Sequence, residues 1–418
     1  MQYAVQCARS LLGSVTALLA FAGIANATTW IVDINNGAGA NFLQIRDAVV
    51  ASQPGDVIIV RPGAYSPLSG AYAINKGITI IGQGTVTVGI LGINDVDIRN
   101  LPAGETVVAV NLTVRGWWIT TCLGSVTIRE SKCRSTTVQQ CADVRIQSMA
   151  AIIGQVSVSN SRVEIANTTI QGDSGNDGQS CNSWWPATNG MTGLSVDGGS
   201  VVHLVRSSVF GGHGGSNSIP GDGGLGVSAY NSELWIDGGG VSTIQGGYGG
   251  WSDGCTTNWD GDNGHGVLMN GGRLIRSGVT LLPTPPQGNG AAGHPLMLLG
   301  GAIDQPVTPD SPTLELARDP LPGGGVLFTI HAPPGSVVRL NLGSQPQVLA
   351  TPGIQVQNLL VKSQSFDLGI TPPQGVVMKR FSISPLALPG DRLFSQAQIV
   401  MPSIAQVRRT ASALVVVR

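Results

Sequence analysis

The chain has 418 residues, 59 of them glycine, with 42% apolar and only 11% charged residues and a net charge of −1. Little charge and much glycine argue against a mainly helical protein and against charged disorder. The near-zero net charge gives no basic surface, so nucleic acid is not expected as a partner. A chain of this length can hold two or three domains.

The N-terminus has the pattern of an export signal. Arg9 precedes the apolar segment 11–24, and Ala25-Asn26-Ala27 fits a cleavage site of the A-x-A type. The alternative is a buried first helix. We expect residues 1–27 to be removed and the mature protein to be secreted or held at the cell surface. No other apolar run is long enough to span a membrane.

The expected mature chain begins with a strand, a helix and two further strands. The strand covers 29–33, the amphipathic helix covers 42–52, and Pro54-Gly55 ends the helix. The next strands are expected at 56–61 and 77–81. The apolar face of the helix is expected to hold Phe42, Ile45, Ala48 and Val49.

Two segments of this opening carry a family resemblance. PGDVIIVRPGAY (54–65) and INKGITIIGQG (74–84) resemble the first coils of pectate-lyase-like right-handed parallel β-helix proteins. The resemblance implies that the preceding helix caps the open end of a solenoid. It says little about activity, because this fold hosts lyases, hydrolases, esterases, adhesins and inert scaffolds.

Valines then recur at a nearly constant spacing of 18 or 19 residues: Val88, Val107, Val126, Val144 and Val163. Alternating apolar residues, mostly Val, Ile and Leu, indicate strands, and one such unit must stack on its neighbours to bury its inner face. The fold class expected is all-β: a parallel β-helix of compact three-strand coils.

Five cysteines follow the export signal, and an exported chain permits disulfides. Cys122 and Cys141 are 19 residues apart, which places them on successive coils. Stacked strands lie about 4.8 Å apart, a separation that a disulfide accepts. A Cys122–Cys141 bridge is expected, the alternative being two reduced cysteines in a ladder. A second bridge, Cys181–Cys255, would leave Cys133 as the odd thiol, the alternative being free cysteines at loop tips.

Three glycine-rich insertions lengthen the later coils, at 172–190, 211–224 and 246–264. Insertions at the same point of successive repeats project from the same face. The first and third match in the positions of a Cys, a Trp and an Asn-Gly pair, so we expect these two to close over the shorter middle loop.

Five aromatic residues in these loops are the candidate ligand-binding residues: Trp184, Trp185, Tyr248, Trp251 and Trp259. Exposed aromatic rings suit stacking on sugars or on protein partners. The alternative is that the rings fill small cores within the loops themselves.

The same loops contain six aspartates, of which Asp222, Asp260 and Asp262 are weak candidates for a calcium site. No calcium-binding loop motif is present, and Asp in glycine-rich turns is ordinarily a turn former. No cofactor is therefore expected, with calcium as the alternative. His213 and His265 are weak candidates for acid–base chemistry.

A further set comes from aligning Asn167, Arg206, Asp237 and Arg276 on consecutive coils. This alignment would place Asp237 between two guanidinium groups. The structural interpretation is a surface charge ladder. The functional one is a strip that binds acidic sugars, because Arg matches carboxylates, with Arg206, Asp237 and Arg276 as weak catalytic candidates in which an Arg would be the base of an elimination. The coils before the long loops are expected to carry few charges, without alignment.

The remaining chain changes composition twice. Residues 301–312 have the composition of a linker, after a last coil near 295–300, so the solenoid is expected over 28–300. Short alternating strands over 313–418 predict a small antiparallel sandwich. Their rhythm resembles the C-terminal β-sandwich modules of many secreted bacterial β-helix proteins.

Two functions are compatible with this pattern. The first is a non-catalytic protein whose aromatic loops bind a polysaccharide or a cell-surface component. The second is a lyase or hydrolase acting on acidic polysaccharide. The first is preferred, because a hydrolase needs two carboxylates at a set separation and a lone Asp237 flanked by arginines does not supply them.

Overall fold

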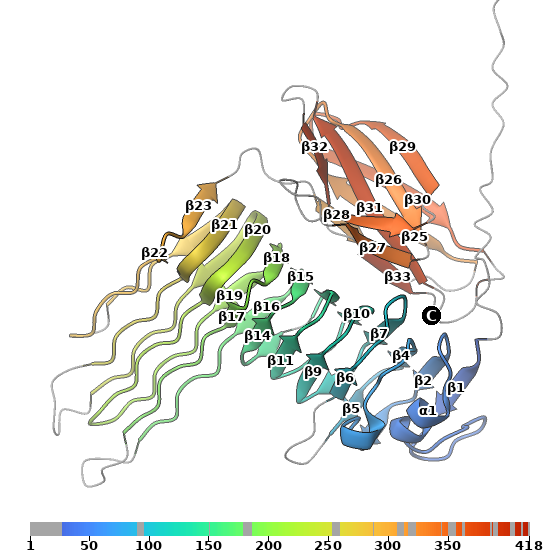
Figure 1. The fold of residues 1–418 in the computed structure, drawn as a ribbon, viewed down its shortest axis with the longest axis horizontal. Helices are drawn as coiled ribbons and strands as arrows, with labels where there is room; N and C mark the ends of the chain where they lie inside the picture. Colours follow the sequence, from blue (N-terminus) through green and yellow to red (C-terminus); the bar gives the residue numbers. More distant parts are fainter. Residues whose placement is uncertain are drawn as a thin grey trace, which may run out of the picture.

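In a computed structural model, the chain is an all-β protein with a long parallel sheet system followed by small antiparallel sheets (Figure 1). No helix among the residues described below is long and apolar enough to cross a membrane. The structure describes residues 27–89, 96–149, 151–178, 186–252, 260–286, 288–306, 313–316, 323–343, 345–349, 357–361, 364–384, 387, 392–401, 406–410 and 413–416. The expected export signal therefore lies outside the described residues, apart from Ala27.

The N-terminal end of the solenoid is covered by helix α1 (Ile45–Ala51), as the resemblance implied. The helix buries Ile45, Ala48 and Val49 against the solenoid core. Strand β1 (Thr29–Val32) precedes it and pairs in parallel with β2 (Val57–Val60). Phe42 lies before the helix rather than within it, and its ring meets that of Trp30 edge-on at 5.4 Å.

The strands of successive coils stack in parallel in three rows, which we call the first, second and third sheets, and some coils contribute only an isolated bridge or no strand to one of them. The first sheet contains β1, β2, β4 (Thr79–Gly82), β7 (Thr106–Val110), β10 (Ser125–Arg129), β12 (Asp143–Gln147), β15 (Arg162–Ala166) and β18 (Val201–Val205). The second contains β6 (Val96–Arg99), β9 (Gly116–Thr120), β11 (Ser135–Gln139), β14 (Val156–Ser159) and β17 (Leu194–Asp197). The third contains β3 (Gly63–Tyr65), β5 (Val86–Val88), β8 (Thr113–Val114), β13 (Ile152–Ile153), β16 (Thr169–Gln171) and β19 (Ser208–Phe210).

The last coils are built from longer strands. Strands β20 (Val227–Gln245) and β21 (Val267–Leu282) each run through all three sheets, and β22 (Leu296–Leu299) and β23 (Ile303–Pro306) complete the final coil. Because β23 still pairs with β21, the solenoid extends to Pro306, beyond the end expected at residue 300. A short 3₁₀ turn, η1 (Gly70–Tyr72), interrupts an early coil.

The valine repeat is confirmed for four of its five members. Val107, Val126, Val144 and Val163 are register partners on consecutive strands of the first sheet, and all four are buried. Val88 was wrongly included: it lies in β5 of the third sheet and pairs with Val114. The early coils are irregular, so β4 precedes β7 in the first sheet and the 19-residue spacing there is a coincidence.

The corners between strands are made by single residues in the left-handed region. Thr121 and Gln140 have φ of 54° and 55°, and Asn160 has 48°. Asn enters this region more readily than other L-residues because its short side chain bonds locally. Such corner residues occur at two edges of the solenoid, after strands of the first sheet and after strands of the second sheet. They are Asn100, Asn111, Thr121, Glu130, Gln140, Ser148, Asn160, Asn167, Arg206 and Asn231.

The residue after each corner turns toward the core, and two of these residues are Cys122 and Cys141. Both are buried, free cysteines. The disulfide expected between them is therefore not formed, and the structure has the alternative, two reduced cysteines stacked in a ladder. The ladder continues in Ser161, whose Oγ accepts a hydrogen bond from Cys141 N at 2.9 Å. Cys133 is likewise a buried, free thiol.

An ion pair closes the C-terminal end of the core. Arg276 occupies the register of the buried Ile236 and Asp304 that of the buried Leu274, so both stand at core-facing positions. Their pairing is bidentate, with Nε–Oδ1 and Nη2–Oδ2 distances of 2.9 Å. The pair gives the last coil a polar surface where the apolar core ends.

The C-terminal residues form the antiparallel sandwich that the strand rhythm predicted. One sheet contains β24 (Thr313–Leu316), β25 (Gly325–His331) and β30 (Val376–Ser382), and another β26 (Val337–Gly343), β29 (Gln364–Ile370), β31 (Arg392–Met401), β32 (Gln406–Arg409) and β33 (Ala413–Val416). Strands β27 (Gln345–Leu349) and β28 (Gln357–Val361) pair with each other as a separate two-stranded antiparallel sheet. Alternate residues such as Phe328 and Leu340 form its core. β27 and β32 had not been predicted.

Candidate functional site

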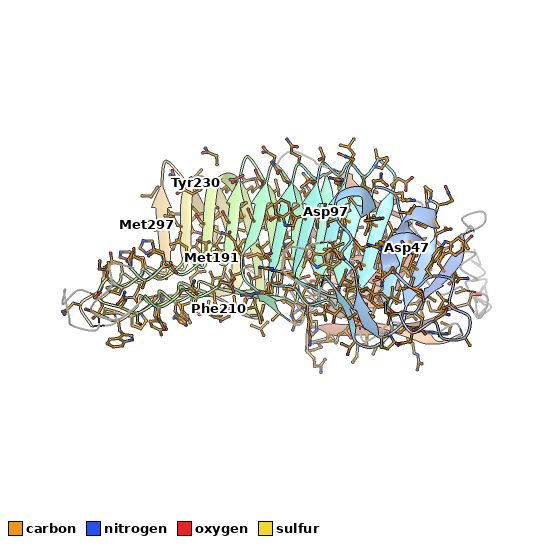
Figure 2. All side chains as sticks on the ribbon, turned by 90° about the horizontal axis from the view of Figure 1, so that it is seen from below. Asp47, Asp97, Met191, Phe210, Tyr230 and Met297 are labelled. Atoms are coloured by element: carbon orange, nitrogen blue, oxygen red, sulfur yellow. The ribbon has the colours of Figure 1, made fainter. Side chains whose placement is uncertain are left out.

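The three glycine-rich insertions do not form separate loops; together with residues 288–295 they build one layered body that we call the glycine slab. It projects from the solenoid edge between the third and second sheets (Figure 1). Its outgoing layer contains 172–178, 211–217 and 246–252, and its returning layer contains 186–193, 219–226, 260–266 and 288–295. Figure 2 shows the two layers, with Phe210 at the start of the outgoing one and Met191 in the returning one.

The runs of the slab have the three-residue period of a polyproline II helix rather than that of a strand. In the outgoing layer, Gly172 N donates to Phe210 O at 2.8 Å and Gly175 N to His213 O at 2.7 Å, three residues further on. The returning layer repeats this step, for example from Gly190 N to Asp222 O at 2.8 Å. None of these runs is a β-strand.

A second set of hydrogen bonds joins the two layers. Gly212 N donates to Met191 O at 2.8 Å, and Gly224 N donates to Gly212 O at 2.8 Å. Each interior run is thus hydrogen-bonded to runs beside it and across the slab. Buried backbone groups are satisfied in this way, and the slab is an ordered part of the fold.

The close approach of the runs explains the glycines. A Cβ on Gly214 would lie 2.0 Å from Gly221 O, and one on Gly247 would lie 1.8 Å from Gly212 O. Interior runs therefore need glycine at two positions in three, as in 211–215 and 246–250. The first run lies at the edge, so Asp173 and Asn176 stand where the interior runs have glycine.

Aspartate side chains complete the hydrogen bonding of the slab. Asp222 Oδ1 accepts from Asp262 N at 2.9 Å, and Asp262 Oδ1 accepts from Ala291 N at 2.8 Å. Asp260 accepts from Ser252 N at 2.8 Å and from Asn289 N at 3.0 Å. All three candidate calcium ligands thus accept hydrogen bonds from backbone N–H groups of the slab. No group of three His, Cys, Asp or Glu suited to a metal ion occurs in the described part of the chain.

The two candidate histidines have a similar role on opposite layers. His213 Nδ1 accepts from Tyr248 N, and His265 Nδ1 accepts from His294 N, both at 3.0 Å. An accepting Nδ1 leaves the proton of a neutral imidazole on Nε2. Burial, together with the charge of neighbouring His294, lowers the pKa of His265. The two histidines are not brought together as an acid–base pair, because one lies in the outgoing and the other in the returning layer.

The outer surface of the outgoing layer, which we call the outgoing face, presents one residue in three. Two aromatic residues of the third run, Tyr248 and Trp251, occupy consecutive outward positions. The Trp251 side chain is 55% exposed. The rings of Tyr248 and His213 stack with centroids 5.3 Å apart. Two of the predicted ligand-binding residues are therefore placed side by side on one face.

Other predicted residues of these loops lie outside the described residues. These are Trp184, Trp185 and Trp259, the cysteines Cys181 and Cys255, and Asp253. Their roles and the Cys181–Cys255 bridge stay predictions. The described runs lie side by side in chain order, so the middle insertion is flanked by the outer two along its whole described length.

The alignment of Asn167, Arg206, Asp237 and Arg276 is only partly right. Asn167 and Arg206 are equivalent corner residues with φ of 49° and 45°. Asp237, however, pairs with Val205 and Ser277, one position away, and Arg276 pairs with Ile236. The register is set by buried pairs, with Leu204 opposite Ile236 and Leu234 opposite Leu274. Arg276 instead binds Asp304.

A charged row on the outer side of the first sheet was missed. Arg145, Glu164 and His203 are register partners on β12, β15 and β18. Arg145 and Glu164 are buried, and Arg145 lies 2.9 Å from Asp143. Burial lowers the pKa of His203 to about 4. The sequence contains the signal for this row, because Arg145, Glu164 and His203 alternate with the core residues of their strands. The expectation that the charges on these coils would not align was wrong.

Comparison with known proteins adds no relative. No protein-family model matches the chain, and no curated protein matches it. The fold and the geometry of the slab therefore carry the functional argument.

Proposed function

We propose that this is an exported, non-catalytic binding protein whose glycine slab recognises a glycan or another cell-surface component. The supporting observation is the outgoing face, where an ordered backbone presents Tyr248, His213 and the exposed Trp251. Exposed hydrophobic and aromatic side chains on a rigid support are the usual centre of a binding surface.

The order of the slab supports binding in a second way. Each interior run is fixed by backbone hydrogen bonds along and across the slab. Such a support loses little conformational entropy when a ligand binds. Long glycine-rich segments without this network would behave as flexible chains.

The catalytic alternative has less support. Arg276 binds Asp304, and Asp237 does not occupy the position between Arg206 and Arg276 that an acidic-sugar strip would need. The other catalytic candidates, His213 and His265, accept hydrogen bonds from slab backbone N–H groups and lie in opposite layers.

A glycan array probed with the full mature chain tests the proposal. We expect binding that Trp251→Ala or Tyr248→Ala weakens about fivefold or more, because each removes a stacking surface of about 1 kcal/mol or more. Leu225→Ala, at an outward position of the returning layer, is the matched control and should bind as the parent protein does.

A polyuronate panel, read by the ultraviolet absorbance of unsaturated products, provides the opposing outcome. Turnover of any substrate by the parent protein, lost in Asp237→Asn, would overturn the non-catalytic proposal. Absence of binding to any glycan on the array would count against the slab as a glycan-binding surface.

A further inference from the structure

We infer that the ligand of the outgoing face is an uncharged, extended polysaccharide that lies along the runs of the slab. This inference rests on the proposed function and names the ligand class. It departs from the acidic polysaccharide that the catalytic alternative would require.

The charge of the insertions is the first argument. Residues 172–190, 211–224 and 246–264 contain six aspartates and no lysine or arginine. A polyuronate approaching this body would meet charges of its own sign, and like-charge juxtaposition is unfavourable for binding. The exposed Arg134 lies close to the slab, but it is paired with Asp173 at 3.6 Å at the edge run.

The distribution of these charges is the second argument. Asp222 and Asp262 are exposed on the opposite, returning side. Among the described outward positions of the outgoing face, Asp177 is the single carboxylate, and its Oδ1 accepts from Ser216 N at 2.7 Å. The face is thus almost uncharged, which also disfavours a cationic ligand.

The side chains around the aromatic rings are the third argument. Gln171 and Gln245 are register partners of Phe210 on either side of it. Ser174 and Ser216 stand at the outward positions beside His213 and Trp251. Amide and hydroxyl groups next to aromatic rings match a sugar, which offers C–H faces and hydroxyl edges at once.

The spacing of the rings sets the direction of the chain. Outward positions recur every three residues, or about 9 Å along a polyproline II run, so Phe210, the His213–Tyr248 pair and Trp251 span about 19 Å. A compact monosaccharide could contact only one of these positions. The runs rise about 3.1 Å per residue. An extended oligosaccharide of about four rings, lying along the runs, would contact all three positions.

The experiment measures affinity by calorimetry with the full mature chain and oligosaccharides of one to six rings. The panel holds neutral glucans, xylans, mannans and galactans, galacturonate oligomers as polyanions, and glucosamine oligomers as polycations. We expect binding of a neutral series, with affinity rising at least tenfold from two to four rings and then levelling off. Raising the salt from 50 to 500 mM should change it less than twofold.

Variants test whether the oligosaccharide binds at the outgoing face. Trp251→Ala and Phe210→Ala should each remove the gain from longer chains, whereas Leu225→Ala should leave affinity and length dependence unchanged. Ser174→Arg, at an exposed outward position of the edge run, should add binding of galacturonate without loss of the slab, read by an unchanged circular dichroism spectrum.

The outcomes separate this inference from the proposed function. Preference for galacturonate or for glucosamine oligomers, weakened by salt and by Trp251→Ala, would overturn the neutral ligand but keep the slab as a binding surface. Binding without length dependence would overturn the extended placement. No binding of any oligosaccharide, in the array or here, would overturn both.

Discussion

At the scale of single residues, the glycines of the slab have the clearest physical role. Two runs can approach within hydrogen-bonding distance only where neither has a side chain between them. Gly215 shows this, because a Cβ there would lie 2.1 Å from Asn176 O. Backbone cannot move aside as a flexible side chain can, so glycine is required by space rather than by backbone dihedral angle at this position.

Gly215→Ala should therefore destabilise the slab by about 2 kcal/mol or more, as overpacking in a closely packed interior does. Hydrogen exchange of amides in the slab and denaturant unfolding measure the effect. Asn176→Ala is the control, because Asn176 is the aligned residue of the edge run, where a side chain is already accommodated. Equal behaviour of the two variants would contradict the spatial explanation.

Cys133 gives a second prediction at this scale. Burial raises the pKa of its thiol to about 11, and the thiolate is the reactive form. At pH 8 about one thiol in a thousand would be ionised, so Cys133 should resist alkylation in the native protein and react after unfolding. Peptide mapping after iodoacetamide treatment measures this. Rapid native labelling of Cys133 would show that the thiol is accessible.

At the scale of elements, the last coil shows how the solenoid ends. Helix α1 covers the apolar core at the N-terminal end, whereas at the other end the Arg276–Asp304 pair stands at core-facing positions. Prolines 283, 285 and 286 follow β21, Pro295 ends the last returning run, and Pro306 ends β23. Proline has no N–H to offer, so these edges present fewer groups for pairing with another chain.

Asp304→Asn should lower the free energy of unfolding by about 1–2 kcal/mol, because it leaves the partly buried Arg276 without its carboxylate. The matched control is Asp367→Asn in the sandwich, whose solvent-exposed pair with Arg339 should contribute less to stability. Denaturant unfolding of both variants provides the comparison. A larger loss for Asp367→Asn would contradict the role of Asp304 in closing the core.

At the scale of the whole molecule, the sandwich and the solenoid interact electrostatically. Burial and the charge of Arg206, a corner residue after β18, lower the pKa of His331 on β25. His203, on the outer side of the first sheet, has register neighbours Glu164 and Trp235, and burial lowers its pKa to about 4. Both histidines thus favour the neutral form in the folded protein.

Stability should therefore fall with decreasing pH. A histidine with a lowered native pKa takes up its proton first in the unfolded chain, so its contribution is complete above about pH 6.5 and is lost as the pH falls toward 4. We expect a loss of roughly 1–3 kcal/mol over this range from His203. Unfolding at several pH values measures it, and His203→Gln should flatten the profile. An unchanged profile in that variant would contradict the assignment.

Much of the fold was predictable from the sequence because local patterns determine it. Alternating apolar residues define the strands, the 18–19-residue spacing of Val107 to Val163 defines the coil, and the repeated point of insertion places the three loops at one edge. The rhythm of the last hundred residues likewise predicted the sandwich. These features depend on which residues must be buried, and the spacing of apolar residues along the sequence indicates which residues those are.

The tertiary structure decided what depends on register and on contacts between distant backbones. Relative to the corner residue Arg206, Asp237 is one position and Arg276 two positions away from the ladder inferred for them, because buried neighbours set the pairing. The insertions, expected to project as loops from one face, are hydrogen-bonded runs whose glycine period of three is visible in 211–215 and 246–250. That period has meaning only when a second and a third run lie alongside, so a single stretch of sequence could not reveal the slab.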